Sequence, residues 1–180
     1  MRTFITAVSA RLVKMERWVL IVLAASITLL ILLNVVTRSF DVALYWVDEL
    51  AIYAMIWLVM VGASATVRTR EGIAVSLLEN MVGVRVWSNL QLLVDVIKLL
   101  FAMTLVWLSW IWYDPISLMS AGFDTTVFSG NTFNFIYDEP TLTIGVPKYL
   151  IWLIMPITAV TMTIHSAANL FSTHDLKQNV

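Results

Sequence analysis

Four long apolar blocks, separated by polar connections, constrain this chain more than any other feature of its sequence. They occupy residues 18–36, 50–67, 86–113 and 148–171. Each is close to or above the roughly 20 residues that an α-helix needs to cross a bilayer. Hydrophobic residues make up 60% of the chain and charged residues 13%, against about 45–50% and 25% in soluble domains. The sequence therefore predicts an all-α integral membrane protein, with four spans packed as a helix bundle in one membrane domain over residues 1–180.

The first block could also be a cleaved signal peptide. Its apolar stretch is too long for that interpretation, and no small-residue cleavage site follows Leu32, Leu33 and Asn34, so we predict a retained helix. The segment before Trp18 mixes apolar and basic residues, as a helix lying in the plane of the inner interface would. A frayed basic tail is the alternative. Residues 73–89 have a similar mixture and also fit an in-plane helix.

Lysine and arginine gather in the N-terminal segment and in the connection between the second and third blocks. These residues are Arg2, Arg11, Lys14 and Arg17 in the first case and Arg68, Arg70 and Arg85 in the second. The connection of residues 114–147 has neither lysine nor arginine, and its acidic residues are Asp114, Asp124, Asp138 and Glu139. Because positively charged connections stay in the cytoplasm, the sequence predicts cytoplasmic N- and C-termini and an outer acidic connection.

The acidic connection is long for a loop without structure of its own. Residues 123–137 alternate aromatic and polar side chains around Ser129, Gly130 and Asn131. This pattern favours either a short hairpin or a re-entrant segment packed on protein. Aromatic residues typical of a membrane interface flank the connection: Trp107, Trp110, Trp112 and Tyr113 on one side and Tyr149 and Trp152 on the other.

Three charged residues lie at the predicted outer ends of the first two spans. Arg38 follows the first span, and Asp48 and Glu49 open the second. A short turn joins these spans, so a pair between Arg38 and either carboxylate is geometrically reasonable. Ionised groups at membrane depth need such partners. We predict a structural clamp here, with a role in ion coupling as the alternative.

Other polar residues within the spans have structural explanations. Asp95 and Lys98 are three residues apart on one helix, which predicts a satisfied surface pair with Lys98 reaching the interface. His165 is predicted to be a hydrogen-bonded packing residue. Pro156 is expected to kink the fourth span and Asn34 to tie helices together.

The sequence offers no constellation for catalysis. It has no nucleophile–base pair, metal cluster or phosphate loop at useful spacing. Cysteine is absent and there are two histidines, which excludes thiol chemistry and the paired axial ligands of a membrane haem bundle. No basic run with interleaved aromatic residues is present, which argues against nucleic acid as a partner. We therefore expect a membrane protein that is not an enzyme and has no cofactor.

The stretch from Asn34 to Arg68 resembles the small-subunit family of tripartite ATP-independent periplasmic (TRAP) transporters. In that family an Asn-x-x-x-Arg leaves the first helix and a Trp-x-[Glu/Asp]-Glu-Leu opens the second. A Trp follows eight residues past the last acid, and a Gly-Ala five residues further. This chain carries Asn34, Arg38, Trp46, Asp48, Glu49, Leu50, Trp57, Gly62 and Ala63, with Arg68 and Arg70 closing the helix. It departs from the family at Gly72 and Ser76, where a His and an Asp are common.

The resemblance implies a small, non-catalytic, multi-pass subunit in the cytoplasmic (inner) membrane of a bacterium or archaeon. Such a subunit scaffolds a large multi-span subunit, which carries the sodium sites for ion-coupled uptake (symport). A periplasmic solute-binding protein delivers an organic acid or similar solute. The resemblance assigns no solute or ion ligand to this chain. It implies structural or subunit-interface roles for Asn34, Arg38, Trp46, Asp48, Glu49, Trp57 and Gly62.

Two other classes of protein remain open from the residues alone. One is a self-sufficient small transporter or channel that works as a homo-oligomer, which would need a charged residue lining a pore. The lack of an internal repeat or broken helices argues against a complete translocation path in this chain. The other is a membrane anchor for a redox or signalling complex, which would need a partner that binds a cofactor.

Overall fold

The computed structural model describes residues 2–70 and 84–178. These residues form α1 (Arg2–Ser39), α2 (Tyr45–Thr69), α4 (Val84–Tyr113), α5 (Pro115–Ser120), α6 (Thr125–Thr132), α7 (Lys148–Trp152) and α8 (Ile154–Gln178). The described part of the chain contains no strand, only an isolated antiparallel bridge between Pro140 and Pro147. The predicted all-α class is therefore confirmed.

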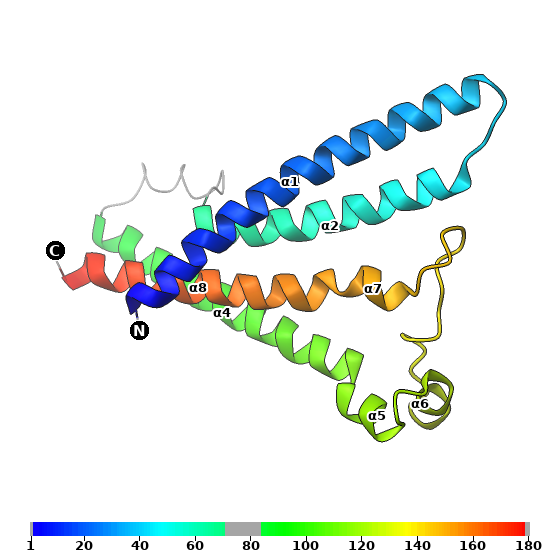
Figure 1. The fold of residues 1–180 in the computed structure, drawn as a ribbon. Coiled ribbons are helices and arrows are strands. Elements are labelled where there is room, and N and C mark those ends of the chain that lie inside the picture. Colours follow the sequence, from blue (N-terminus) through cyan, green and yellow to red (C-terminus); the bar gives the residue numbers. More distant parts are fainter. Residues whose placement is uncertain (1, 71–83, 179–180) are drawn as a thin grey trace.

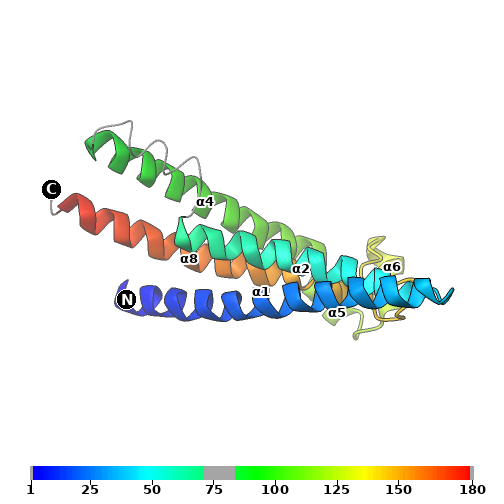
Figure 2. The same ribbon diagram turned by 90° about the horizontal axis from the view of Figure 1, so that it is seen from above.

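Within residues 2–70 and 84–178, four helical stretches are long and apolar enough to cross a membrane. They are Phe4–Ser39, Tyr45–Thr69, Val86–Ser120 and Lys148–Ser172, which confirms the four predicted spans. The chain runs up and down between two ends. Both termini lie at one end, and the α1–α2 turn lies with α5 and α6 at the other (Figures 1 and 2).

The C-terminal helix α8 is the centre of the bundle. It packs against α1, α2 and α4, and α1 also packs along α2. Toward the α1–α2 turn, α1 and α2 diverge from α4, and α7 lies between them (Figure 1). None of the residues in the most apolar 18-residue window of α1 is buried within the chain. This helix therefore offers most of its surface to lipid or to another protein.

The predictions of an in-plane N-terminal helix and of a frayed tail are both wrong. The segment before Trp18 continues the first span without interruption as a single helix of 38 residues. It packs on the bundle because Ser9 and Glu16 are buried and bond to residues of α2 and α8. At 1.5 Å per residue, α1 is about 57 Å long and exceeds the roughly 30 Å hydrocarbon core.

The other predicted in-plane segment, residues 73–89, falls largely outside the described residues. Its last six residues, 84–89, form the start of α4. Gly72 and Ser76, at which the chain departs from the resembled family, also lie outside the described residues.

The fourth span is broken where Pro156 predicts a kink. Proline has no backbone N–H and cannot donate to the carbonyl four residues earlier, which here belongs to Trp152. The helix is accordingly interrupted at Leu153, between α7 and α8. The Ile157 amide resumes the helical pattern by donating to the Leu153 carbonyl at 3.2 Å.

Within the connection between α4 and α7, residues 123–137 were predicted to form either a hairpin or a re-entrant segment. They contain the helix α6, so the prediction of a hairpin is wrong. The Asp124 carboxylate accepts from the amides of Thr126 and Val127, and such an N-cap favours a helix. Phe128 of α6 is buried, with its ring centroid 5.2 Å from that of Tyr137. The connection therefore packs on its own aromatic residues.

Tyr137 fixes this connection to the end of α4. Its hydroxyl donates to the Tyr113 carbonyl at 2.6 Å, and the Tyr113 hydroxyl donates to the Tyr149 carbonyl at 2.8 Å. Burial, with the nearby Asp114 carboxylate, raises the pKa of Tyr137. The phenol therefore keeps its proton and remains a donor at neutral pH.

Candidate functional site

A closed polar triangle, which we call the α1–α2 joint, connects the end of α1 to the start of α2. The Arg38 Nη2 lies 2.7 Å from Asp48 Oδ2, and Arg38 Nε donates to Asn34 Oδ1 at 2.8 Å. The Asn34 side-chain amide donates to Asp48 Oδ1. Asn34 and Arg38 share one helix face because they are four residues apart. Arg38 therefore pairs with Asp48, one of its two predicted partners, and the predicted tie through Asn34 is present as well.

The charge pair of the joint contributes little stability. The Arg38 and Asp48 side chains are 57% and 40% exposed, and exposed ion pairs contribute only about 0–1 kcal/mol. Asp48 also lies in the first turn of α2, where a carboxylate interacts favourably with the helix dipole. These contacts join two long helices beside a short turn, in which Asp41 has a positive φ of 58°.

Glu49 does not pair with Arg38. Its carboxylate binds the loop before α7, and we call this contact the Glu49 latch. The backbone amides of Leu142, Thr143 and Ile144 donate to it at 2.8, 2.7 and 3.2 Å. The Thr143 hydroxyl and the Tyr53 hydroxyl donate as well. A single carboxylate of α2 thus holds a segment more than 90 residues later in the chain.

The two tryptophans of the motif, Trp46 and Trp57, have different surroundings. The Trp57 indole N–H donates to the Ile151 carbonyl of α7 at 2.9 Å, so it ties α2 to the fourth span. Trp46 is 43% exposed. Gly62 faces α1, where an added Cβ would lie 3.8 Å from the Leu20 side chain. That distance is ordinary packing, so the glycine is not required by a close helix approach within this chain.

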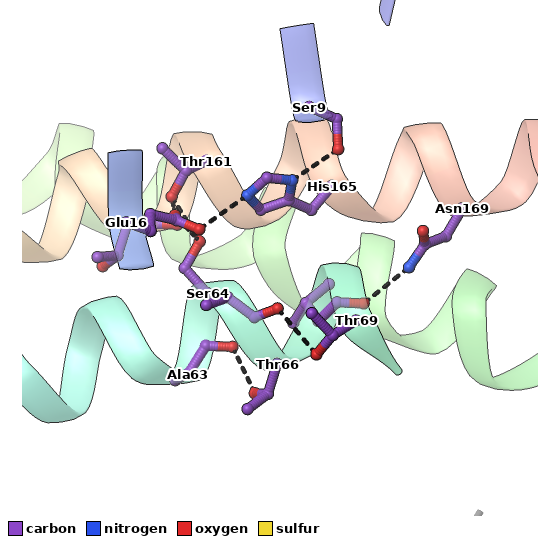
Figure 3. Close-up of polar contacts among 12 residues, drawn as sticks. Ser9, Glu16, Ala63, Ser64, Thr66, Thr69, Thr161, His165 and Asn169 are labelled. Atoms are coloured by element: carbon purple, nitrogen blue, oxygen red, sulfur yellow. Dashed lines mark hydrogen bonds and ion pairs between the residues drawn. The ribbon is translucent and has the colours of Figure 1, made fainter. Parts of the chain in front are cut away.

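Near the termini, α1, α2 and α8 share a second set of polar contacts, the buried polar cluster of Ser9, Glu16, Ser64, Thr161 and His165 (Figure 3). The two oxygens of Glu16 contact Ser64 Oγ at 2.6 Å and His165 Nε2 at 3.1 Å. The other ring nitrogen of His165 is 2.7 Å from Ser9 Oγ, and Ser64 Oγ is 2.7 Å from Thr161 Oγ1. The prediction of a hydrogen-bonded packing role for His165 is confirmed.

The expected surface pair of Asp95 with Lys98 is wrong. Asp95 is 2% exposed, and its carboxylate accepts from Arg70 Nη2 at 2.5 Å. Arg70 caps the end of α2 in a left-handed conformation and also donates to the Asn169 carbonyl of α8. The physical reason is that Asp95 lies on the α4 face that packs toward the bundle, where a residue of another helix meets it.

Two of the residues that organise these contacts were missed by sequence reasoning. Glu16 precedes the predicted first span, and no role was predicted for it. The signal available was an acidic residue seven positions after Ser9 on one helical face, a spacing of about two turns. For the loop residue Thr143 the sequence carried no comparable signal. Gly145, at φ 74°, marks the turn but not the residue that the loop contacts.

The clusters are suited to joining helices. Their hydrogen bonds and ion pairs join α1 to α2 and α8, and the end of α2 to α4. Within the described ranges, no group of three or more His, Cys, Asp or Glu side chains is placed to hold a metal ion. Four membrane-capable helices joined by such contacts define a polytopic helical membrane protein.

The family follows from the sequence comparison. Residues 27–175 match the family described as "Tripartite ATP-independent periplasmic transporters, DctQ component", and the chain belongs to this family. This is the small-subunit family of TRAP transporters, an inner-membrane component, and it is not a family of known enzymes. The matched residues include the α1–α2 joint, the Glu49 latch and the whole of the fourth span. No curated protein and no solved structure matches the chain.

Proposed function

We propose that this chain is the scaffolding subunit of a TRAP-type secondary transporter and holds a large multi-span subunit that performs the transport. In this proposal the large subunit binds sodium and the solute, and a periplasmic binding protein delivers an organic acid or similar compound. The observation that carries the proposal is that charged side chains in or next to the spans contact other residues of the same chain. Arg38, Asp48, Glu49, Arg70 and Asp95 are all engaged in contacts within the chain.

The exposed surface of the helices supports the same role. The apolar window of α1 is unburied within the chain, although α1 is fixed to α2 by the joint. A scaffold needs a rigid frame with apolar faces that another membrane subunit and lipid can cover. The joint and the latch give α1, α2 and the loop before α7 fixed positions relative to one another.

The first test is an affinity pull-down of this chain from detergent-solubilised native membranes, with partners identified by mass spectrometry. We expect one large multi-span protein in about equal amount. Recovery of the chain alone as a discrete oligomer would contradict the proposal and favour a self-sufficient homo-oligomeric transporter or channel.

A second test separates scaffolding from ion coupling. Glu49→Ala and Arg38→Ala are expected to lower co-purification of the large subunit and solute uptake, with the sodium-to-solute stoichiometry unchanged. Thr126→Ala, which removes only an exposed hydroxyl of α6, is the control and should behave as the wild type. An altered coupling ratio in either charge variant would show that these side chains take part in coupling.

A further inference from the structure

A pocket of about 270 Å³ lies where α4, the acidic connection and α7 meet. Its lining residues are Trp112, Asn134, Phe135, Ile136, Glu139, Lys148 and Trp152. The rings of Trp112 and Trp152 are in edge contact, with centroids 6.0 Å apart. The pocket therefore combines an aromatic wall with one cation and one anion, none of which takes part in the α1–α2 joint, the Glu49 latch or the buried polar cluster.

The wall formed by the connection is fixed by hydrogen bonds between the Asn134 side chain and backbone groups. Asn134 donates to the Trp112 carbonyl at 2.7 Å and accepts from the Ile136 amide at 3.1 Å. These bonds attach the connection to the end of α4. The pocket shape is thus set before any ligand binds, which lowers the entropic cost of binding.

Backbone contacts hold the two charged residues, Glu139 and Lys148, next to each other. The Lys148 amide donates to the Glu139 carbonyl at 2.9 Å, and the neighbouring Pro140 and Pro147 form a bridge. Lys148 Nζ lies 3.1 Å from Glu139 Oε2, with the side chains 31% and 59% exposed. An ammonium has three donors and a carboxylate has about four acceptor positions. Each group therefore retains capacity for a further partner besides the other.

The pocket lies at the level where the fourth span begins and α4 nears its end. Lys148 is the first residue of the fourth span, and Trp112 lies in the last part of α4. Leu108 and Phe101 precede Trp112 by four and eleven residues, so they lie on the same face of α4 and deeper in the span. Both side chains are about half exposed. Tryptophan at this level is typical of the headgroup region.

We propose that this pocket binds the headgroup of a phospholipid that carries both a phosphate and a primary amine, of the phosphoethanolamine type. The phosphate contacts the Lys148 ammonium, and the amine donates to the Glu139 carboxylate. The acyl chains run along the apolar α4 face of Leu108 and Phe101. The proposal requires only that the chain spans a membrane and does not depend on the transporter assignment.

The paired charges make the site selective. A phosphocholine headgroup has a quaternary amine without an N–H and cannot donate to Glu139. A phosphoglycerol headgroup has a net negative charge and lacks an amine to offset Glu139. Because exposed charge pairs contribute about 0.2–1 kcal/mol, we expect a preference of about 1.4- to 5-fold for phosphoethanolamine lipid over phosphocholine lipid.

Native mass spectrometry of the purified full chain in detergent tests the proposal with the three lipids at matched acyl chains. The apparent dissociation constant for each lipid is measured, and soluble phosphoethanolamine is added as a competitor. We expect the phosphoethanolamine lipid to bind tightest and the soluble headgroup to compete only at far higher concentration. Equal binding of all three lipids would overturn the proposal, and so would competition by the free headgroup at the concentration of the lipid.

Two variants assign the effect to the pocket. Glu139→Gln should remove the preference over phosphocholine lipid and improve binding of phosphoglycerol lipid. Lys148→Gln should weaken binding of all three lipids, because each carries a phosphate. Lys14→Gln makes the same charge change at an exposed position of α1 and should leave the preference intact. A preference that survives in both pocket variants, or disappears in Lys14→Gln, would place the lipid elsewhere and overturn the assignment.

Discussion

Single buried polar side chains hold the end of the bundle near the termini. Glu16 is 8% exposed and His165 is fully buried, and they belong to helices at opposite ends of the sequence. Each hydrogen bond is worth only about 0.5–1.5 kcal/mol, but a buried group left without its partner costs about 1–3 kcal/mol. The buried polar cluster therefore matters most when one of its members is removed.

Glu16→Ala is accordingly expected to destabilise the chain by about 1–3 kcal/mol, since it leaves Ser64 and His165 without their shared acceptor. Glu16→Gln should cost less, because its amide oxygen still accepts from one of them. The free energy of unfolding, measured by denaturant titration in detergent, checks this. Lys14→Ala changes an exposed residue two positions earlier and is expected to be near neutral. If Glu16→Ala matched that control, the buried polar cluster would have no structural role.

At the scale of elements, two adjacent carboxylates of α2 hold different parts of the chain. Asp48 binds Arg38 of α1, whereas Glu49 accepts from the loop before α7. Consecutive residues on a helix point about 100° apart, so one side chain can face α1 while the next faces the loop. This division explains why two acids in succession are useful at the start of α2.

The division predicts separable effects of two isosteric changes. Glu49→Gln has only one acceptor oxygen and is expected to free residues 140–147, with faster hydrogen exchange at Leu142 and Thr143. Asp48→Asn should instead loosen the α1–α2 turn and leave that loop protected. Hydrogen-exchange mass spectrometry of both variants in detergent provides the measurement. Identical exchange patterns in the two variants would contradict separate roles.

At the scale of the whole molecule, the charge distribution predicts how the bundle lies in the membrane. The structure places both termini at one end and the acidic connection at the other (Figure 1). The positive-inside rule assigns the terminal end to the cytoplasm. The natural chain has no cysteine, so a single introduced thiol reports the location of one position.

Thr126→Cys in α6 should react with a membrane-impermeant maleimide from the periplasmic side. Lys14→Cys in α1 should react only after the membrane is disrupted. Both positions are exposed in the chain, so a difference in labelling reports the side of the membrane and not burial. Labelling of Lys14→Cys in intact spheroplasts, with Thr126→Cys protected, would reverse the predicted orientation.

The sequence by itself determined the four spans, the break near Pro156 and an ion pair between Arg38 and one of the two carboxylates that open the second span. These features depend on local properties: the length of an apolar run, the missing amide of proline, and opposite charges on the two sides of a short turn. The family motif also lies within one short stretch, Asn34 to Arg68, which includes Arg38 and Asp48. The family could therefore be predicted from the sequence of that stretch.

Only the tertiary structure decided which distant residues meet. His165 contacts Glu16 across 149 positions of sequence, and Leu142 contacts Glu49 across 93. The sequence likewise placed Asp95 on the surface, whereas the packing of α4 on α8 buries it against Arg70. Such pairs depend on which helices are neighbours and on the rotation of each about its axis. Because the four membrane-capable helices are strongly apolar, periodicity alone could not fix that rotation.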